Sequence, residues 1–235
     1  MAPRTTASGR TRPPLSRERV VAEAVALADE HGIDGLSMRR LAERLQVEPM
    51  SLYHHVANKD VILDGMVDLV FAEVELPDLQ TSWTKALRRR CDSLRAALHR
   101  HRWAIGVMES RLSPGPATLR HHDAVIGCLR AAGCSIALTA HAFSAIDSYV
   151  YGFAMQEANL PFQSPEESAR MAVTFLEQFP ATVFPHLAEF TLGHVLVPGY
   201  DYGEEFGFGL DLLLDGLERI RQAQVDAPGS ADPFT

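Results

Sequence analysis

The sequence predicts an all-α protein, and three observations lead to that fold class. Apolar residues recur at helical spacing along most of the 235-residue chain. No segment shows the strict alternation of apolar and polar residues that is typical of a half-buried strand. Serine and asparagine caps, glycines and prolines divide the chain into helix-sized segments. With 46% apolar residues the chain can fill a substantial core, so we expect a folded protein.

The first predicted helix covers residues 16–31. Ser16 can cap its N-terminus, and apolar residues recur at helical spacing until Gly32 ends the pattern. The preceding residues 1–14 are rich in Pro, Ser, Thr and Arg, and they cannot bury enough apolar surface to order themselves. We therefore expect a disordered basic arm before the first helix.

Two short helices are expected next, over residues 38–45 and 49–55. Ser37 can cap the first of them, and Pro49 suits the first turn of the second. Only three residues separate the two helices, and so brief a turn is typical of a helix-turn-helix motif. Gln46 stands in this turn at a position where many such motifs carry glycine.

Longer helices are expected in the rest of the chain, and Asn58 can cap the first of them. Their predicted ranges are 59–75, 82–98, 103–110, 119–133, 135–159, 166–179, 185–192 and 204–222. The helix over residues 135–159 is apolar almost all round, so it should lie centrally or in an interface. We expect a helix-turn-helix domain over residues 15–61, a second helical domain over residues 62–224 and a disordered tail over residues 225–235.

The charges are divided unevenly between the two predicted domains. The whole chain carries a net charge of −8, but its first 61 residues hold nine Lys and Arg against eight Asp and Glu. Five arginines and one acidic residue occupy the first nineteen positions. A polyanion such as DNA should therefore bind at the N-terminal end, because the remainder is a poor surface for nucleic acid.

Several classes of protein are disfavoured by composition and motif. The N-terminus has no apolar signal segment and the chain has no span of about 20 apolar residues, so we expect a soluble cytosolic protein with no membrane contact. Cys91, Cys128 and Cys134 lack paired spacing and are expected to be reduced and buried. No metal, cofactor or catalytic motif is present, so we predict no metal site, no cofactor and no enzyme. An architectural DNA-binding protein would need a broad basic surface that residues 62–235 lack.

Two stretches of the N-terminal domain carry a resemblance to a known family. Residues 32–42 read GIDGLSMRRLA, and residues 51–59 read SLYHHVANK. Over about residues 15–63 the chain resembles the DNA-binding domain of the tetracycline-repressor (TetR) family, and residues 149–152 and 208–217 more weakly resemble its dimerisation helices. The resemblance implies a homodimeric repressor that leaves a palindromic operator when a small molecule binds its C-terminal domain.

The resemblance also implies a set of DNA-contacting residues on and around the third helix. Tyr53 and Lys59 would contact phosphates, and Arg39 would reach a phosphate or a guanine in the major groove. The full set is Ser37, Met38, Arg39, Pro49, Met50, Ser51, Tyr53, His54, His55 and Lys59. Judged from the residues alone, Tyr53 and His55 could instead belong to the core. Met50 departs from the polar or small residue that is usual there, so the operator sequence cannot be transferred.

A small-molecule cavity in the C-terminal domain is a further implication of the resemblance, with ligand binding moving the helix over residues 59–75. Tetracycline repressors bind a drug-magnesium chelate through a histidine, and Met108 stands at the matching position. A thioether is a poor ligand for magnesium, so we predict an apolar or aromatic small molecule instead of the chelate. The predicted lining is Leu94, Met108, Leu112, Val125, Cys128, Phe143, Asp147 and Tyr151. A polar stripe on one helix lines either this cavity or the dimer interface, and consists of His141, Ser144, Ser148 and Tyr151.

Dimerisation is expected from the small size of the recognition helix. One such helix makes few base contacts, so useful affinity requires two of them at a fixed separation. We expect the helices over residues 135–159 and 204–222 to form the dimer interface, with Gly209 and Gly216 allowing close approach. The predicted partners are thus double-stranded operator DNA, a small-molecule effector and a second copy of the chain.

Overall fold

The computed structural model describes residues 14–108, 110–162, 164–178 and 181–226. Over these residues the protein consists of helices and connecting turns, with no strand, which confirms the predicted fold class. Most of the predicted arm and tail lies outside the described residues. Val225 and Asp226, which we expected in the tail, instead belong to the last helix.

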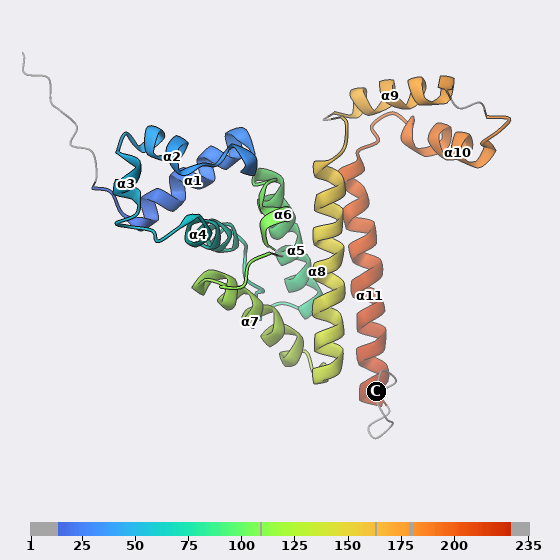
Figure 1. Cartoon of the computed structure of the whole chain (residues 1–235). Coiled ribbons are helices and arrows are strands. Elements are labelled where there is room, and N and C mark those ends of the chain that lie inside the picture. The colour runs from blue at the N-terminus through green and yellow to red at the C-terminus, as the bar shows by residue number, and fades with distance from the viewer. Residues whose placement is uncertain (1–13, 109, 163, 179–180, 227–235) are drawn as a thin grey trace, which may run out of the picture.

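Three short N-terminal helices lie together at one side of the molecule (Figure 1). They are α1 (Arg17–His31), α2 (Met38–Leu45) and α3 (Pro49–Leu52), with a 3₁₀ turn, η1 (Ile33–Gly35), between the first two. The predicted caps are present, because the Ser16 hydroxyl accepts from the Arg19 N–H and the Ser37 hydroxyl accepts from the Arg40 N–H. Glycine ends α1 at Gly32, whose φ is 72°.

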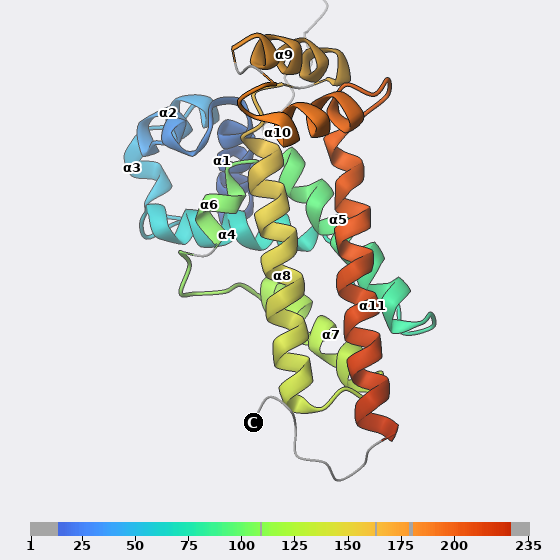
Figure 2. The ribbon, with the colours of Figure 1, turned by 90° about the vertical axis from the view of Figure 1, so that its right-hand side faces the viewer.

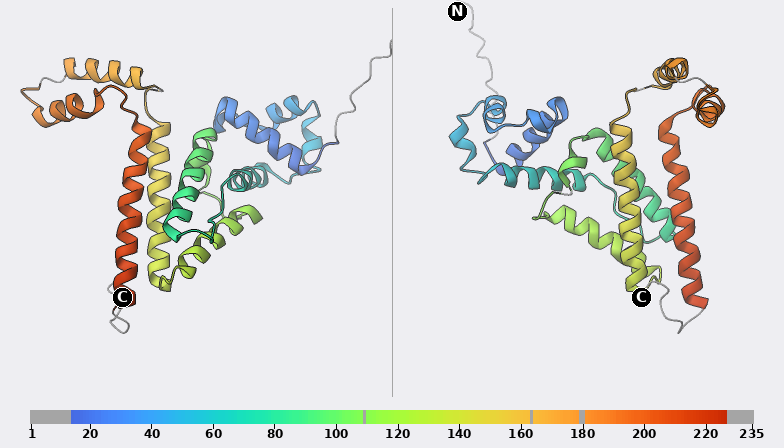
Figure 3. Two further views of the ribbon diagram at one scale, coloured as in Figure 1. Left: turned by 180° about the vertical axis from the view of Figure 1, so that it is seen from behind. Right: turned by 45° about the vertical axis from the view of Figure 1, so that its right-hand side comes forward.

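Helix α4 (Lys59–Ala72) connects the N-terminal helices to the rest of the chain. Asn58 caps it by accepting from the Val61 N–H at 2.9 Å. It packs against α1 on one side and against α7 on the other (Figure 3). The helix ends at Ala72 instead of the predicted Glu75, because the Glu75 N–H donates to the Ser93 hydroxyl and not to a carbonyl of α4.

The C-terminal domain is built around a pair of long antiparallel helices, α8 (Ile136–Ala158) and α11 (Glu205–Asp226) (Figure 1). Helices α5 (Trp83–Arg100) and α7 (Pro116–Ala131) pack against α8, and the short α6 (Ala104–Met108) lies between α4 and α8. Tyr149 on α8 joins the long pair by donating to the Phe206 carbonyl at 2.8 Å. A Cβ on Gly209 would collide with the Tyr149 ring, so this glycine serves contact within the chain and not the approach of a partner.

A helical arm lies beyond one end of the α8–α11 pair (Figure 2). It contains α9 (Pro165–Gln178), α10 (Pro185–Phe190), the π-helical η2 (Thr191–Val195) and the 3₁₀ turn η3 (Tyr202–Glu204). Apolar side chains of this arm are exposed, among them Val183, Leu187 and Phe190. The arm therefore presents apolar surface that the described part of this chain does not cover.

One continuous core extends from α1 to α11. The core runs through α4, so the helix-turn-helix domain and the C-terminal domain share one hydrophobic interior and do not fold around separate cores. Cys91, Cys128 and Cys134 are free and buried in it, as predicted. None of the described helices is both long and apolar enough to cross a membrane.

Candidate nucleic-acid interface and ligand cavity

Helix α3 is anchored by one side and exposes the other. Leu52 and Val56 are buried in the core, where α3 packs against α2, while Pro49 and Met50 are exposed. Helical geometry ends at Leu52, three residues before the predicted end, and residues 53–55 continue as turns. This arrangement presents a short, well-anchored ridge to a partner.

The two residues whose place was open on sequence grounds, Tyr53 and His55, both lie on the surface. Tyr53 is 46% exposed, and His54 and His55 are exposed next to it. A phenol hydroxyl and two imidazoles here can reach phosphate oxygens or base edges. Ser51 is half-buried on the same short helix.

The predicted contact residues around α3 differ in how free their polar groups are. The Ser37 hydroxyl is engaged as the cap of α2, and Met38 is partly buried against the core. The guanidinium of Arg39 is exposed and pairs with Glu43 at 2.9 Å, one turn along α2. The Lys59 ammonium donates to the Leu36 carbonyl at 2.9 Å, so it fixes the start of α4 beside α2 while its charge stays at the surface.

The turn between α2 and α3 contains a residue in the left-handed region. Gln46 has φ 57° and ψ 48°, a conformation that glycine adopts most readily. This is the position where the sequence lacks the glycine of many related turns. Nearby, Arg44 holds α2 to α1 through two contacts of 2.7 Å to Glu30 and one of 3.0 Å to Glu23.

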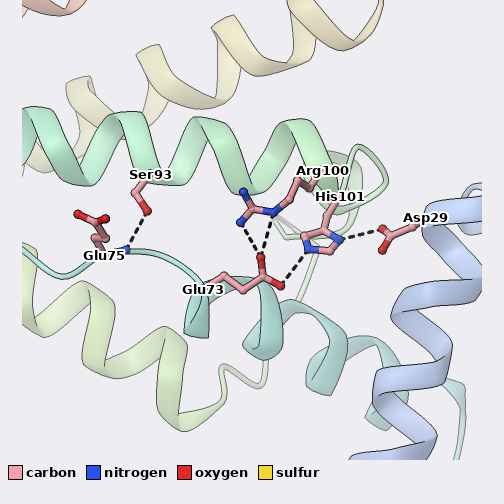
Figure 4. A network of polar contacts seen from close by, with 6 residues as sticks. All are labelled: Asp29, Glu73, Glu75, Ser93, Arg100 and His101. Carbon is pink, nitrogen blue, oxygen red and sulfur yellow. Dashed lines mark hydrogen bonds and ion pairs between the residues drawn. The ribbon is translucent and has the colours of Figure 1, made fainter.

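A polar network ties α1 and the end of α4 to the end of α5 (Figure 4). His101 is buried, with Nδ1 2.8 Å from Asp29 on α1 and Nε2 3.1 Å from Glu73 after α4. The Trp103 indole N–H donates to the same Asp29 carboxylate at 2.6 Å, and Arg100 pairs with Glu73 at 2.6 Å. The network therefore fixes the angle between the N-terminal helices and the C-terminal domain.

The middle of α4 is joined to the start of α7, because a side chain of α4 caps the N-terminus of α7. The N-cap residue of α7 is Gly115, which has no side chain to offer. The carboxylate of Asp68 on α4 takes this role, because it accepts from the Thr118 N–H at 2.8 Å and from the Thr118 hydroxyl at 3.0 Å. Movement of α4 along α7 would break both bonds.

A cavity of about 750 Å³ lies between α4, α6, α7 and α8. Its apolar lining includes Val67, Phe71, Ile105, Met108 and Phe143, and its polar lining includes Asp64, Arg111, Thr118, His122, Ser144, Asp147, Ser148 and Tyr151. This volume falls within the range of pockets that hold drug-sized ligands. Because α4 forms one wall, a ligand in the cavity contacts the helix that leads to α3.

Half of the predicted lining residues lie on this cavity: Met108, Phe143, Asp147 and Tyr151. The other half do not. Leu94, Val125 and Cys128 turn toward the core and are buried there, and Leu112 is 97% exposed on the loop after α6. Three members of the predicted polar stripe, Ser144, Ser148 and Tyr151, line the cavity. The fourth, His141, is exposed and does not line it.

A buried charged cluster stands behind Asp147, and the sequence prediction did not include it as a unit. Arg90 on α5 is fully buried, with Nη1 2.7 Å from Asp147 and Nε donating to His121 Nε2 at 2.9 Å. Burial, followed by the charge of Arg90, lowers the pKa of His121 to about 3, so this imidazole is neutral. The sequence contained one indication of this cluster: Arg90 stands on the apolar stripe of α5, three residues after Leu87.

Two family models match the chain and together span most of it. The model described as "Bacterial regulatory proteins, tetR family" matches residues 20–66, which contain α2 and α3. The model described as "Tetracyclin repressor-like, C-terminal domain" matches residues 76–221, which contain most of the cavity lining.

Individual proteins are similar to the chain over most of its length. The HTH-type transcriptional repressor DrrR1 of Streptomyces coeruleorubidus is 37% identical over 219 residues, covering 88% of this chain and 78% of that protein. The TetR family protein ActR of Streptomyces coelicolor, solved in complex with actinorhodin, superposes with a TM-score of 0.73 at 30% identity, covering 88% of this chain and 98% of that one. BioQ of Mycobacterium smegmatis, solved with its double-stranded DNA operator, gives a TM-score of 0.60 at 27% identity, covering 87% and 98%.

Proposed function

The chain belongs to the TetR family of bacterial regulatory proteins, and from this premise we propose that it is a repressor released from its operator by a small aromatic or apolar effector. It is a DNA-binding transcriptional regulator that responds to a ligand. The observation that carries the proposal is the position of α4, which leads directly from α3 and also forms a wall of the cavity. A regulator of bacterial genes acts where the chromosome is, so we place it in the cytoplasm.

We assign operator contact to the exposed groups of α3 and its surroundings. Met50 and His54 would meet base edges, and Tyr53, Arg39 and Lys59 would contact phosphates. The engaged groups have supporting roles, because the Ser37 cap and the Lys59 bond to Leu36 hold α2 and α4 around the recognition helix. The basic residues at the N-terminal end of the chain would attract the phosphates of the operator DNA.

Two copies of the chain are needed to place two α3 helices on one operator. The face of α11 that turns away from the core exposes Phe208 at 67% and Leu212 at 60%, one helical turn apart. Ile136 is exposed on α8, the helix beside it. We therefore propose that α8 and α11 of two protomers form a four-helix interface.

Effector binding is proposed to act through the contacts that α4 makes at the rim of the cavity. Arg111, which lines the cavity, lies 3.0 Å from Asp60 and 3.6 Å from Asp64 at the start of α4. Thr118, also on the lining, holds Asp68 farther along α4. A ligand that shifts either group moves α4, and α3 then leaves the geometry that fits the operator.

The DNA-binding part of the proposal is tested by selecting genomic fragments with the purified protein and measuring mobility shifts on the recovered site. Tyr53→Ala should weaken operator binding by about tenfold, the value of one or two phosphate contacts, without altering thermal unfolding. Phe184→Ala is the matched control, because Phe184 is also 46% exposed but precedes α10 in the arm. Equal operator affinities for the two variants would remove Tyr53 from the interface.

The effector part is tested by isothermal calorimetry with a panel of apolar and aromatic compounds, each then added to the protein-operator complex. We expect binding of at least one aromatic compound and release of the operator by that compound. Tight binding of magnesium-tetracycline alone would overturn the predicted effector class.

A further inference from the structure

The cavity is amphipathic, and one face of α8 supplies a polar side to it. Ser144, Asp147, Ser148 and Tyr151 follow one another at helical spacing along the lining. The other elements contribute apolar and aromatic side chains, among them Phe71 on α4, and polar ones that include Asp64, Arg111, Thr118 and His122. A ligand that fills this space has an apolar body and a polar edge that meets α8.

Asp147 is the centre of the polar side, and its surroundings fix it as a hydrogen-bond acceptor. Arg90 cannot lose its proton, and among the described residues Asp147 is the carboxylate within ion-pair distance of it, at 2.7 Å. The neutral His121 accepts from Arg90 Nε, whereas Asp147 pairs with Nη1, so the two residues do not compete for the same nitrogen of the guanidinium. An ionised carboxylate has no proton to donate, and a ligand atom placed against it must bring one.

The cluster is also incompletely hydrogen-bonded. Within the described part of the chain, Arg90 Nη2, His121 Nδ1 and Asp147 Oδ1 are buried and have no hydrogen-bond partner, although Oδ1 forms the ion pair with Arg90 Nη1. Since His121 Nε2 accepts from Arg90, its Nδ1 carries the proton and is a donor as well. Asp147 is therefore held by its ion pair with Arg90 and keeps the capacity to accept a hydrogen bond from a ligand.

We propose that the effector carries a hydroxyl group on the polar edge of an aromatic ring system, and that this hydroxyl donates to Asp147 while Ser144 or Ser148 donates to its oxygen. The inference rests on the proposed function, because it names the chemistry of the compound that the cavity takes. Arg90 and His121 act as positioning residues, since they hold the carboxylate and do not line the cavity. A methyl ether of the same ring system lacks the proton and leaves the carboxylate desolvated without a partner.

Three related probes test the inference: 2-hydroxyfluorene, which has one phenolic hydroxyl on a flat ring system and no acceptor within the molecule for it, its methyl ether, and fluorene, which lacks the substituent. Equilibrium dialysis with the wild-type protein should give 2-hydroxyfluorene an affinity about 10- to 100-fold above that of the ether, the effect of one hydrogen bond to a charged group. Fluorene should bind as weakly as the ether.

The variant that carries the test replaces both charges, as Arg90→Met with Asp147→Leu. Removing Asp147 alone would leave Arg90 buried without a counter-charge and could unfold the protein, whereas replacing both partners by apolar residues is often neutral for stability. The double variant should bind 2-hydroxyfluorene and the ether within about threefold of each other. Arg95→Met with Glu157→Leu is the control, because that pair is bidentate but lies outside this cavity, and it should keep the wild-type ratio.

The outcomes separate this inference from the proposed function. If the wild type binds 2-hydroxyfluorene and its ether equally well, the cavity takes aromatic compounds but Asp147 does not select a hydroxyl, and the inference alone is overturned. If the double variant folds and keeps the wild-type preference, the hydroxyl is recognised elsewhere and the inference is likewise overturned. If the wild type binds none of the three probes, the aromatic effector class and the inference fail together.

Discussion

The cap that joins α4 to α7 gives a sharp test of the packing around the cavity. Gly115→Ala would place a methyl carbon 2.5 and 2.6 Å from the two carboxylate oxygens of Asp68. Those oxygens must withdraw by roughly 1 Å to reach an ordinary nonbonded distance of ~3.5 Å. The bonds of 2.8 and 3.0 Å from Thr118 would then be lost.

The cost of this substitution follows from what Thr118 loses. Its backbone N–H is one of the unpaired donors at the start of α7, and the residue is buried, so water does not readily replace the carboxylate. Loss of a cap together with an unpaired buried donor costs about 1–3 kcal/mol. For a chain of this length that corresponds to a decrease in Tm of roughly 3–10 °C.

Thermal unfolding followed by circular dichroism measures the effect, with Gly127→Ala as the control on the same helix. A Cβ at Gly127 meets no atom within 4 Å, so this change should be neutral or stabilising by up to about 1 kcal/mol. In an Asp68→Ala background, Gly115→Ala should have little further effect, because the group it displaces is absent. The reasoning is refuted if Gly115→Ala unfolds at the same temperature as the wild type, or if its effect is unchanged when Asp68 is removed.

Three further predictions concern acid stability, the turn before α3 and assembly. The pKa of His121 is about 3 in the folded protein, below the 6.5 of an ordinary histidine, so the unfolded chain alone gains this proton as the pH falls from 6.5 towards 3. The free energy of unfolding should therefore fall by up to about 1.4 kcal/mol per pH unit in that window. His121→Gln keeps an acceptor for Arg90, and its free energy of unfolding, measured with urea, should fall less steeply with pH. Parallel plots of unfolding free energy against pH for the variant and the wild type would contradict this. Gln46→Gly should leave the free energy of unfolding unchanged or raise it by up to about 1 kcal/mol, because glycine adopts the left-handed conformation without strain and this gain offsets its larger loss of backbone entropy. A loss above about 1 kcal/mol in urea unfolding would show that the contacts of the Gln46 side chain outweigh the backbone strain. Leu212→Arg should convert the dimer to a monomer in light scattering, because it places a charge in the proposed interface. Leu119→Arg, on the exposed side of α7, is the control and should leave the dimer intact. A dimer that persists in Leu212→Arg would show that this part of α11 does not form the interface.

The helices and their caps could be predicted because their signals are local. Ser16, Ser37 and Asn58 each cap the helix that follows, and the turn residues stand beside the helices that they end. The exposure of α3 did not follow from the pattern alone, because Tyr53 and His55 could have belonged to the core, and the structure places both on the surface. Helix ends shifted by a few residues where a side chain from elsewhere took a backbone group, as Ser93 does at Glu75.

The cavity lining was predicted only in part, because spacing along a helix does not say what lies opposite each face. Thr118, His122 and Val125 follow one another at helical spacing on α7, yet Thr118 and His122 line the cavity, whereas Val125 and Cys128, nearer the end of the helix, are buried in the core. Both parts of the helix contain residues suited to a pocket. Their assignment depends on where α7 crosses α4 and α8, which the Asp68 carboxylate helps to set.

The sequence by itself determined the all-helical architecture, the recognition helix and the family, since each of these is encoded in residues close together along the chain. Tertiary structure decided which charges are buried, which helix caps another and which side chains face the cavity. Arg90, His121 and Asp147 come from α5, α7 and α8, and no spacing along the chain relates them. Their meeting is set by the packing of three helices on one core, because only that packing removes the water that would otherwise solvate each group separately.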